Sequence, residues 1–413
     1  MSGLFLRNAR ILDGSGQAPF DGSVHVEGTR IKKMAGHNAA APSGTQEIDC
    51  SGRTLMPGLV ESHGHVTFGD TASLEALGEI PPEEHTILAM KNARTMLDQG
   101  FTSINSAAAA KPRLDVVLRN AIDAGDCPGP RMLAASPEMT VTGGLGDVRL
   151  SHMYRETFAI VCDGPDEFRR TAREMVREGV DTLKINPSGD EFVPVARAHQ
   201  TVMNESEIAA VCEVARSRDK RVAAHCRSAE SVKLCVKHGV EMIYHATLCD
   251  DEALAALESA RDWVFVAPTI GITLATLYEA SAWGITTDVA EGMGMKAELD
   301  IAIPNLKALK KAGVRLLPGG DYGFAWNPIG TNARDLEHFV NHLGFTPMEA
   351  IEAATRLGGE IMMRGDDLGQ IREGYTADML LVDDDPLENI AILQDASRLS
   401  MIMKDGAVYK NVA

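Results

Sequence analysis

Two histidines, His63 and His65, stand two positions apart at the end of a short apolar run. This run, residues 58–60, follows a proline–glycine step and is typical of a short buried strand. Side chains at positions i and i+2 of a strand point to the same face, so both imidazoles are predicted to reach one place. Convergent imidazoles are half of a typical protein metal site. The pair predicts a metal centre if further ligands end neighbouring strands.

Four more residues with ligand chemistry stand at apolar, strand-like runs downstream. Lys184 lies within 180–186, and the runs 221–224, 240–244 and 314–320 are followed by His225, His245 and Asp321. From His63 to Asp321 the successive intervals are 121, 41, 20 and 76 residues.

Those intervals favour a (β/α)8 barrel, which has about 250 residues, or roughly 30 for each strand–helix unit. They place the ligand-type residues on strands 1, 4, 5, 6 and 8, whose carboxyl ends form the catalytic face of that fold. Helical patterns over 205–215, 250–257 and 296–311 alternate with the strand-like runs, as a parallel sheet requires. The predicted fold class is therefore α/β, with a TIM barrel at its centre.

Both ends of the chain differ from this middle. Residues 3–56 and 366–413 contain short β-type runs separated by glycine, aspartate and proline, a pattern of hairpins. Neither end is long enough to bury its own core. We predict one small β-sandwich domain from residues 1–57 and 366–413, with the barrel domain at 58–365.

Composition excludes some functions and favours an intracellular enzyme. The net charge of −18 argues against nucleic acid or an anionic membrane as partner, because both attract basic surfaces. No window reaches the ~20 apolar residues of a membrane span, and the N-terminus lacks the apolar core of a signal peptide. The seven scattered cysteines fit a reducing compartment. We expect a cytoplasmic protein, assembled as a homo-oligomer, with a small-molecule substrate.

The motifs "ESHGH" and "GGD", with the lysine and two histidines between them, resemble those of the amidohydrolase superfamily. The resemblance is to its binuclear-metal, imidazolonepropionase-like hydrolases, which include prolidase-like, carboxypeptidase-like and xenobiotic amide, urea and carbamate hydrolases. It covers almost the whole chain, including "GRTLMPGLVESHGH", "TPMEAIEAATRLGGEIM" and "DLGQIREGYTADMLLVDDDPLENI". The same arrangement, a barrel inserted between halves of a β-sandwich, is implied by the resemblance.

The resemblance also implies a role for each ligand-type residue. His63, His65 and Asp321 would hold one divalent metal and His225 and His245 the other. Lys184 would bridge them as a carbamate formed with carbon dioxide, because an ammonium group cannot ligate a metal. Zinc is the first choice, while manganese, iron or cobalt suit the same donors. A metal-bridging hydroxide would attack the substrate, and Asp321 would carry its proton to the leaving nitrogen.

The pocket is expected to come from the loops that follow the strands. Peptidase-like members of the family bind the α-carboxylate of the substrate with a histidine and a tyrosine, at positions where this chain has Leu145 and Arg227. Leucine cannot donate a hydrogen bond, whereas Arg227 could still clamp a carboxylate or be structural. Further predicted pocket residues are Met139, Tyr322, Phe324 and Trp326.

These departures favour hydrolysis of an N-acyl or aryl amide, a carbamate or a urea in a small molecule. The alternative is carboxypeptidase-like or prolidase-like cleavage of N-acyl amino acids or dipeptides, and a cyclic-amidine deaminase ranks below it. A non-enzymatic alternative is a homologue that has lost its metals and acts as a structural protein.

Overall fold

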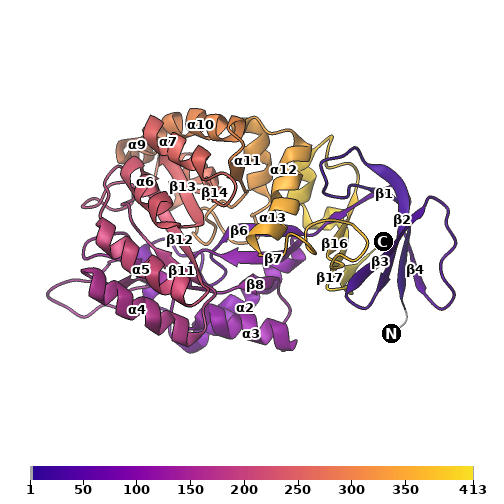
Figure 1. Cartoon of the computed structure of the whole chain (residues 1–413), viewed down its shortest axis with the longest axis horizontal. Coiled ribbons are helices and arrows are strands. Elements are labelled where there is room, and N and C mark those ends of the chain that lie inside the picture. Colours follow the sequence, from indigo (N-terminus) through magenta and orange to yellow (C-terminus); the bar gives the residue numbers. More distant parts are fainter. Residues whose placement is uncertain (1–2, 413) are drawn as a thin grey trace.

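The computed structural model describes residues 3–412 and divides them between a barrel and a smaller sheet (Figure 1). The smaller sheet, on the right in Figure 1, has the strand order β18-β17-β16-β5-β1-β2-β3, and β4 pairs with β1. From the first end of the chain come β1 Leu4–Ile11, β2 Phe20–Glu27, β3 Arg30–Gly36, β4 Gln46–Asp49 and β5 Arg53–Pro57. From the other end come β16 Met379–Asp383, β17 Leu399–Lys404 and β18 Ala407–Asn411.

The two chain ends are joined where β16 pairs antiparallel with β5, for example Leu381 opposite Leu55. A separate apolar cluster fills this part of the molecule, with Leu6, Val24, Leu55, Leu381 and Met401 among its buried members. The prediction that both ends of the chain build one small β-structure is therefore confirmed.

The chain leaves the small sheet at β5 and enters the barrel at β6 Leu59–Gly64. Gly58 lies between them, and a Cβ there would come within 2.2 Å of Thr102 Oγ1, so only glycine fits. This passage coincides with the predicted limit at residues 57/58, while the division into domains stays a prediction.

Eight parallel strand positions follow one another in the barrel. The first three are β6, β7 Phe101–Ser106 and a third position split into β8 Arg131–Leu133 and β9 Ala135–Thr140, with β10 Ile160–Val161 alongside β9. The others are β11 Thr182–Ile185, β12 Arg221–Ser228, β13 Met242–Leu248, β14 Phe265–Ala267 and β15 Arg315–Leu316.

Two observations bring the last strand back to the first. Ser62 Oγ in β6 donates a hydrogen bond to Pro318 O, just after β15. One apolar cluster fills the interior with side chains from several strands, including Val60, Ala223, Tyr244, Phe265 and Leu317. This packing is that of a TIM barrel.

Helices cover the outside of the barrel (Figure 1). Each strand is followed by at least one helix, and the largest apolar cluster of the molecule lies between strands and helices. The helical pattern predicted over 205–215 corresponds to α5, which Asn204 caps: its side chain accepts from Glu207 N, in a capping box. The helices are α1 Leu74–Glu79, α2 Pro82–Asp98, α3 Leu114–Ala124, α4 Pro165–Glu178, α5 Glu205–Ser217, α6 Ala229–His238, α7 Asp251–Ser259, α8 Ile270–Tyr278, α9 Thr287–Met293, α10 Met295–Lys311, α11 Arg334–Leu343, α12 Pro347–Ala354 and α13 Arg356–Ile361, with 3-10 turns at Ala280–Trp283, Ile390–Gln394 and Ala396–Arg398.

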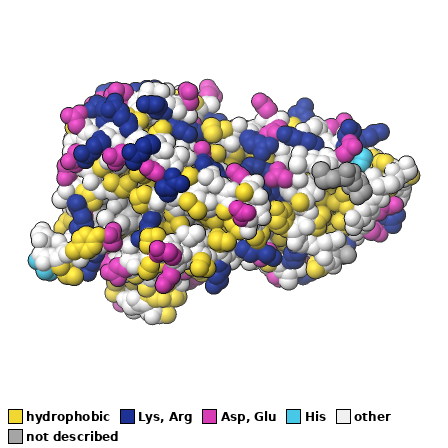
Figure 2. Space-filling model, turned by 90° about the horizontal axis from the view of Figure 1, so that it is seen from below, with side chains coloured by type: hydrophobic (Ala, Val, Ile, Leu, Met, Phe, Trp, Pro, Cys, Tyr) yellow, Lys and Arg dark blue, Asp and Glu magenta, His cyan; other side chains and the backbone are white. Residues whose placement is uncertain are grey.

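The surface carries charged side chains of both signs, and the cysteines lie in the interior. On the face shown in Figure 2, basic and acidic side chains are interspersed over both parts of the molecule. All seven cysteines are buried and free. Within residues 3–412, no helix is long and apolar enough to cross a membrane.

Candidate metal centre

The six ligand-type residues predicted from the sequence line one cavity at the carboxyl edge of the barrel strands. His63 lies in β6 and His65 directly after it, Lys184 in β11, His225 in β12 and His245 in β13, while Asp321 follows β15. The first five are at most 3% exposed, and the Asp321 side chain is 15% exposed. Fold closure thus brings together residues that are up to 258 positions apart in the chain.

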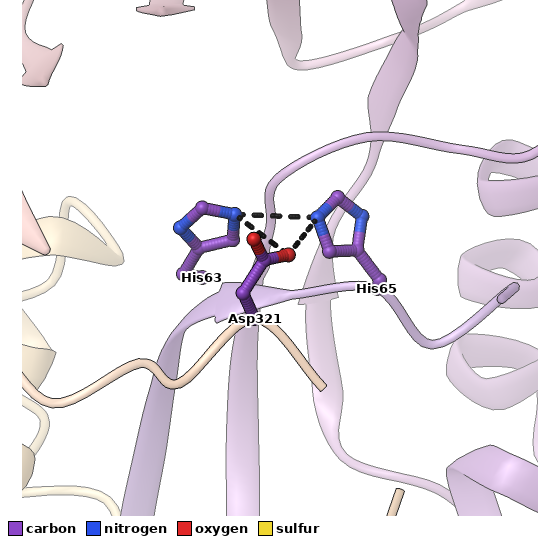
Figure 3. Close-up of side chains that lie close together, drawn as sticks. All are labelled: His63, His65 and Asp321. Atoms are coloured by element: carbon purple, nitrogen blue, oxygen red, sulfur yellow. Dashed lines mark hydrogen bonds and ion pairs between the residues drawn. The ribbon is translucent and has the colours of Figure 1, made fainter. Parts of the chain in front are cut away.

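His63, His65 and Asp321 form the tightest group (Figure 3). The two Nε2 atoms lie 3.2 Å apart, and Asp321 Oδ1 is 3.5 Å from His63 Nε2 and 3.0 Å from His65 Nε2. On its other side, His65 Nδ1 lies 3.3 Å from Ala108 O, a contact that fixes the ring and directs Nε2 to Asp321. Two imidazole nitrogens and a carboxylate oxygen that converge in this way suit one divalent cation.

His225 and His245 each use one ring nitrogen in a protein contact and keep the other. His225 Nε2 lies 3.1 Å from Gly189 O, so the lone pair remains on Nδ1. His245 Nδ1 bonds Thr269 Oγ1, while His245 Nε2 is buried without a hydrogen-bond partner among the described residues. Their ring centroids are 4.3 Å apart. A buried nitrogen that lacks a partner is costly unless a ligand binds it, so this pair fits a second cation.

Burial keeps these nitrogen ligands uncharged. Desolvation lowers the pKa of His63 and His245 well below the usual range and lowers that of His225 to about 3. Desolvation also lowers the pKa of Lys184, whose Nζ lies 3.8 Å from Glu138 Oε1 and 4.7 Å from the centre of the Tyr244 ring. Neutral imidazoles bind metals, and a neutral amine can react with carbon dioxide.

Asp321 behaves in the opposite way. Burial alone would raise the pKa of its carboxyl, but the close contacts with His63 and His65 hold that pKa well below the usual range. The carboxylate is therefore ionised at neutral pH and can ligate a cation or accept a proton.

The backbone around the cavity is strained. His245, Ala246, Thr269 and Asp321 have φ angles of 73°, 52°, 55° and 59°, in the left-handed region. Non-glycine residues enter that region at a cost of roughly 1–2 kcal/mol each. Such strain clusters at sites where side-chain direction matters more than stability.

Buried acids beneath the cavity hold the two strands that carry the tight group. Glu61 accepts from His63 N at 2.9 Å and from Asn332 Nδ2 at 2.7 Å. Asp335 accepts from Gly319 N at 2.7 Å, two residues before Asp321. Burial raises the pKa of Glu61 to about 8 and that of Asp335 to about 7. These contacts fix the backbone of His63 and of the turn that presents Asp321.

Three of the six predicted pocket residues line the cavity: Leu145, Arg227 and Phe324. The other three are placed behind its wall. Met139 is fully buried in the core because alternation along β9 directs Glu138 to the cavity and Met139 away from it.

Tyr322 and Trp326 also lie behind the wall. Tyr322 is buried with its hydroxyl unpartnered among residues 3–412, and its ring fills the space next to Gly320. Trp326 stacks on Phe324 with centroids 5.9 Å apart and donates from Nε1 to Thr276 Oγ1. These two rings support the cavity wall.

Sequence reasoning missed other parts of the wall. Glu138 and Asp190 add carboxylates next to Lys184 and His225. Glu138 could have been found from the alternation of "ASPEMT", and Asp190 from its place after the Lys184 strand. The remaining apolar lining comes from loops and helices without a local signal: Phe68, Leu74, Phe158, Phe192 and Ile272.

Comparison with known proteins agrees with this geometry. Residues 54–408 match the Amidohydrolase family. The chain belongs to that family. The predicted resemblance and the fold of a TIM barrel with a small β-domain are thereby confirmed.

Ochratoxinase from Aspergillus niger is 25% identical over 381 residues, which span 86% of this chain and 75% of the fungal protein. Imidazolonepropionase from Mycolicibacterium smegmatis is 23% identical over 407 residues, or 94% of this chain and 91% of the bacterial one. Among solved structures, a prolidase complexed with N-methylphosphonate-L-proline is 26% identical with a TM-score of 0.89, covering 99% of this chain and 100% of the other. The similarity to these hydrolases extends over both parts of the molecule.

Proposed function

We propose that this protein is a metal-dependent hydrolase of an amide-type C–N bond in a small molecule, such as an N-acyl or aryl amide, a carbamate or a urea. The observation that carries the proposal is the convergence of four histidines, one lysine and one aspartate on a single cavity in an amidohydrolase-family chain. Membership of the family supports hydrolysis, and the donor set supports metal dependence.

Two divalent cations fit this donor set. His63, His65 and Asp321 would hold one cation and His225 and His245 the other, with Lys184 between them. Zinc is the first choice, since imidazole and carboxylate suit it, and manganese, iron and cobalt are alternatives. When bound, such cations lower the pKa of water and polarise the carbonyl group of the substrate.

Lys184 can serve only after modification, because an ammonium group has no lone pair for a metal. Its side chain is 1% exposed, and burial favours the neutral amine that adds carbon dioxide. The resulting carbamate is anionic and reaches the cavity on a long arm. We therefore infer a carbamylated Lys184.

Asp321 is the group suited to move the proton. It is ionised, it lies beside His63 and His65, and it is the most exposed of the six ligand-type residues towards the cavity. We assign it the proton of the attacking water and its delivery to the leaving nitrogen, in general acid–base catalysis.

The apolar part of the cavity lining favours an apolar substrate. Four phenylalanines, two leucines and one isoleucine form it. The free volume of the cavity is about 40 Å³.

A second candidate is carboxypeptidase-like or prolidase-like hydrolysis. The specific observation in its favour is the 26% identity and TM-score of 0.89 with a prolidase. Leu145 weighs against it, because that side chain lines the cavity and offers no hydrogen-bond donor to a carboxylate.

A substrate panel tests the proposal. Purified protein loaded with zinc, and separately with manganese, would be assayed by mass spectrometry on aryl amides, N-phenylureas, aryl carbamates, N-acyl amino acids and Xaa-Pro dipeptides. We expect release of an amine from members of the first three groups and loss of activity after chelation. Release of free amino acids alone would identify the second candidate. No hydrolysis by protein that holds two metals per chain would contradict both.

A further inference from the structure

Arg227 is the one guanidinium that residues 3–412 contribute to the cavity wall, and it is already paired on two sides. Its Nε donates to Asp190 Oδ2 at 2.7 Å and its Nη1 to Glu298 Oε1 at 2.5 Å. The side chains of these three residues, the Arg227 triad, are at most 5% exposed. A buried arginine with two carboxylates differs from a free cation that waits for a ligand.

Three elements build the triad. Arg227 lies in β12 two positions after His225, Asp190 follows β11, and Glu298 lies in the first turn of α10. Thr247 Oγ1 in β13 donates a further hydrogen bond to Glu298 Oε1 at 2.5 Å. Because the partners are held by separate strands and a helix, the guanidinium cannot turn to a new ligand without breaking buried contacts.

The triad carries a net negative charge. Asp190 Oδ2 lies 2.7 Å from Arg227 Nε, and Glu298 Oε1 lies 2.5 Å from Arg227 Nη1. Two carboxylates thus face one cation. Moreover, Glu298 Oε2 is buried with no hydrogen-bond partner in the part of the chain that the structure describes.

We propose that Asp190 and Glu298 set the charge specificity of the cavity: they make it reject a substrate carboxylate and accept a neutral group. A carboxylate near Arg227 would meet an excess of negative charge in a water-poor site, and like charges brought together in such a site repel strongly. The inference rests on the proposed function and narrows its substrate class.

A matched pair of compounds tests it: N-benzoyl-L-phenylalanine and its carboxamide, N-benzoyl-L-phenylalaninamide. Both contain the same benzoyl–nitrogen bond and differ only in the charged group. Release of benzoate gives kcat/KM, and calorimetry gives Kd for each compound on the metal-loaded full chain. We expect the parent protein to favour the carboxamide over the carboxylate by about tenfold or more, both in kcat/KM and in Kd, because placing like charges together is costly.

Glu298→Gln removes one negative charge and nearly keeps the shape. We expect the carboxamide-to-carboxylate ratio to fall by about tenfold or more, because Arg227 then faces a single carboxylate. The matched control is Asp300→Asn, on the same helix but exposed, where the ratio should stay within about twofold of the parent. Bound metals act on both compounds in all variants, so the change in ratio isolates the triad.

Three results decide between the outcomes. An unchanged ratio in folded Glu298→Gln, or a parent protein that favours the carboxylate, would overturn the inference. If Glu298→Gln does not fold, Asp190→Asn replaces it, and the parent ratio alone can still refute the idea. If neither compound is hydrolysed but the Kd ratios shift as expected, the inference stands on binding alone, and the substrate panel decides the proposed function separately.

Discussion

Two hollows in this molecule differ in size and in chemistry. The larger, of about 940 Å³, lies between the small sheet and residues 384–398 and is lined by charged side chains. The smaller, of about 40 Å³, is the barrel cavity that holds the ligand-type residues. By volume alone, the first would be taken as the binding site.

In the larger cleft the arginines are matched with acids. Arg10 pairs with Asp385 at 2.7 Å, Arg53 with Asp383 at 2.8 Å, and Arg398 with Asp384 at 3.5 Å. The side chains of these pairs are 23–70% exposed, so water screens the charges, and such pairs contribute roughly 0–1 kcal/mol each. The charged groups of these three pairs are therefore satisfied by one another and do not require a ligand.

In the barrel cavity, by contrast, buried polar groups are left unsatisfied. Among residues 3–412, His245 Nε2 finds no hydrogen-bond partner although it is buried. His63 and His65 direct their Nε2 atoms to one carboxylate, and the supporting backbone is strained. Unsatisfied groups that converge in a buried place are costly unless a ligand completes them. Convergence and unmet bonding, rather than volume, therefore distinguish the cavity that we propose as the metal centre.

The largest effect on activity is expected from Lys184→Ala in the barrel cavity. If the lysine bridges two metals as a carbamate, the variant should lose detectable turnover and hold fewer than two metals per chain. Short carboxylic acids such as propionate should restore part of the activity, because they supply the missing anion. Kinetics and elemental analysis, with bicarbonate present during metal loading, measure both.

The matched control is Lys404→Ala, another buried lysine, whose Nζ donates to Gly129 O far from the cavity. The folded fraction of this variant should keep two metals per chain and the kcat of the parent protein. Normal metal content and turnover in Lys184→Ala would remove the lysine from the metal centre.

Asp321→Asn should have the next largest effect. The change keeps the shape but removes the charge that ligates and accepts a proton, and general acid–base catalysis contributes roughly 10²–10⁴-fold. We therefore expect kcat to fall by at least about three orders of magnitude, with a smaller change in KM. Only protein shown by elemental analysis to be metal-replete is compared. A kcat within about tenfold of the parent would show that Asp321 is not the proton shuttle.

The order of strand ends explains why so much of the centre could be predicted. Each ligand-type residue ends or follows an apolar run, and the intervals between them fit the repeat of a barrel. The helix that starts after Asn204 and the β-type runs of both termini were equally visible, because caps and alternation are local signals.

Contacts between distant residues could not be predicted in the same way. Arg227 meets Asp190 and Glu298, which are 37 and 71 positions away, so its pairing depends on how the loop after β11 and α10 pack. Trp326 was predicted to contact the substrate, yet Phe324 lies between it and the cavity. Residue type indicates what a side chain can do, but packing decides which of two neighbouring aromatic rings faces the cavity.

The smallest effect on stability and activity is expected from Arg10→Gln in the larger cleft. A large effect on activity would contradict the distinction between this cleft and the barrel cavity. This change removes the ion pair with Asp385 and a 3.3 Å contact with Thr54 Oγ1, both partly exposed to water. We expect unfolding to become easier by about 1 kcal/mol or less, and kcat/KM to stay within about twofold of the parent. Thermal unfolding and steady-state kinetics on the best substrate from the panel measure these values. A drop of more than about tenfold in kcat/KM, in protein with unchanged Tm and two metals, would exceed what a screened surface pair can cause. The cleft would then be a second functional site, and the ion pairs that line it would have to be read as a binding surface.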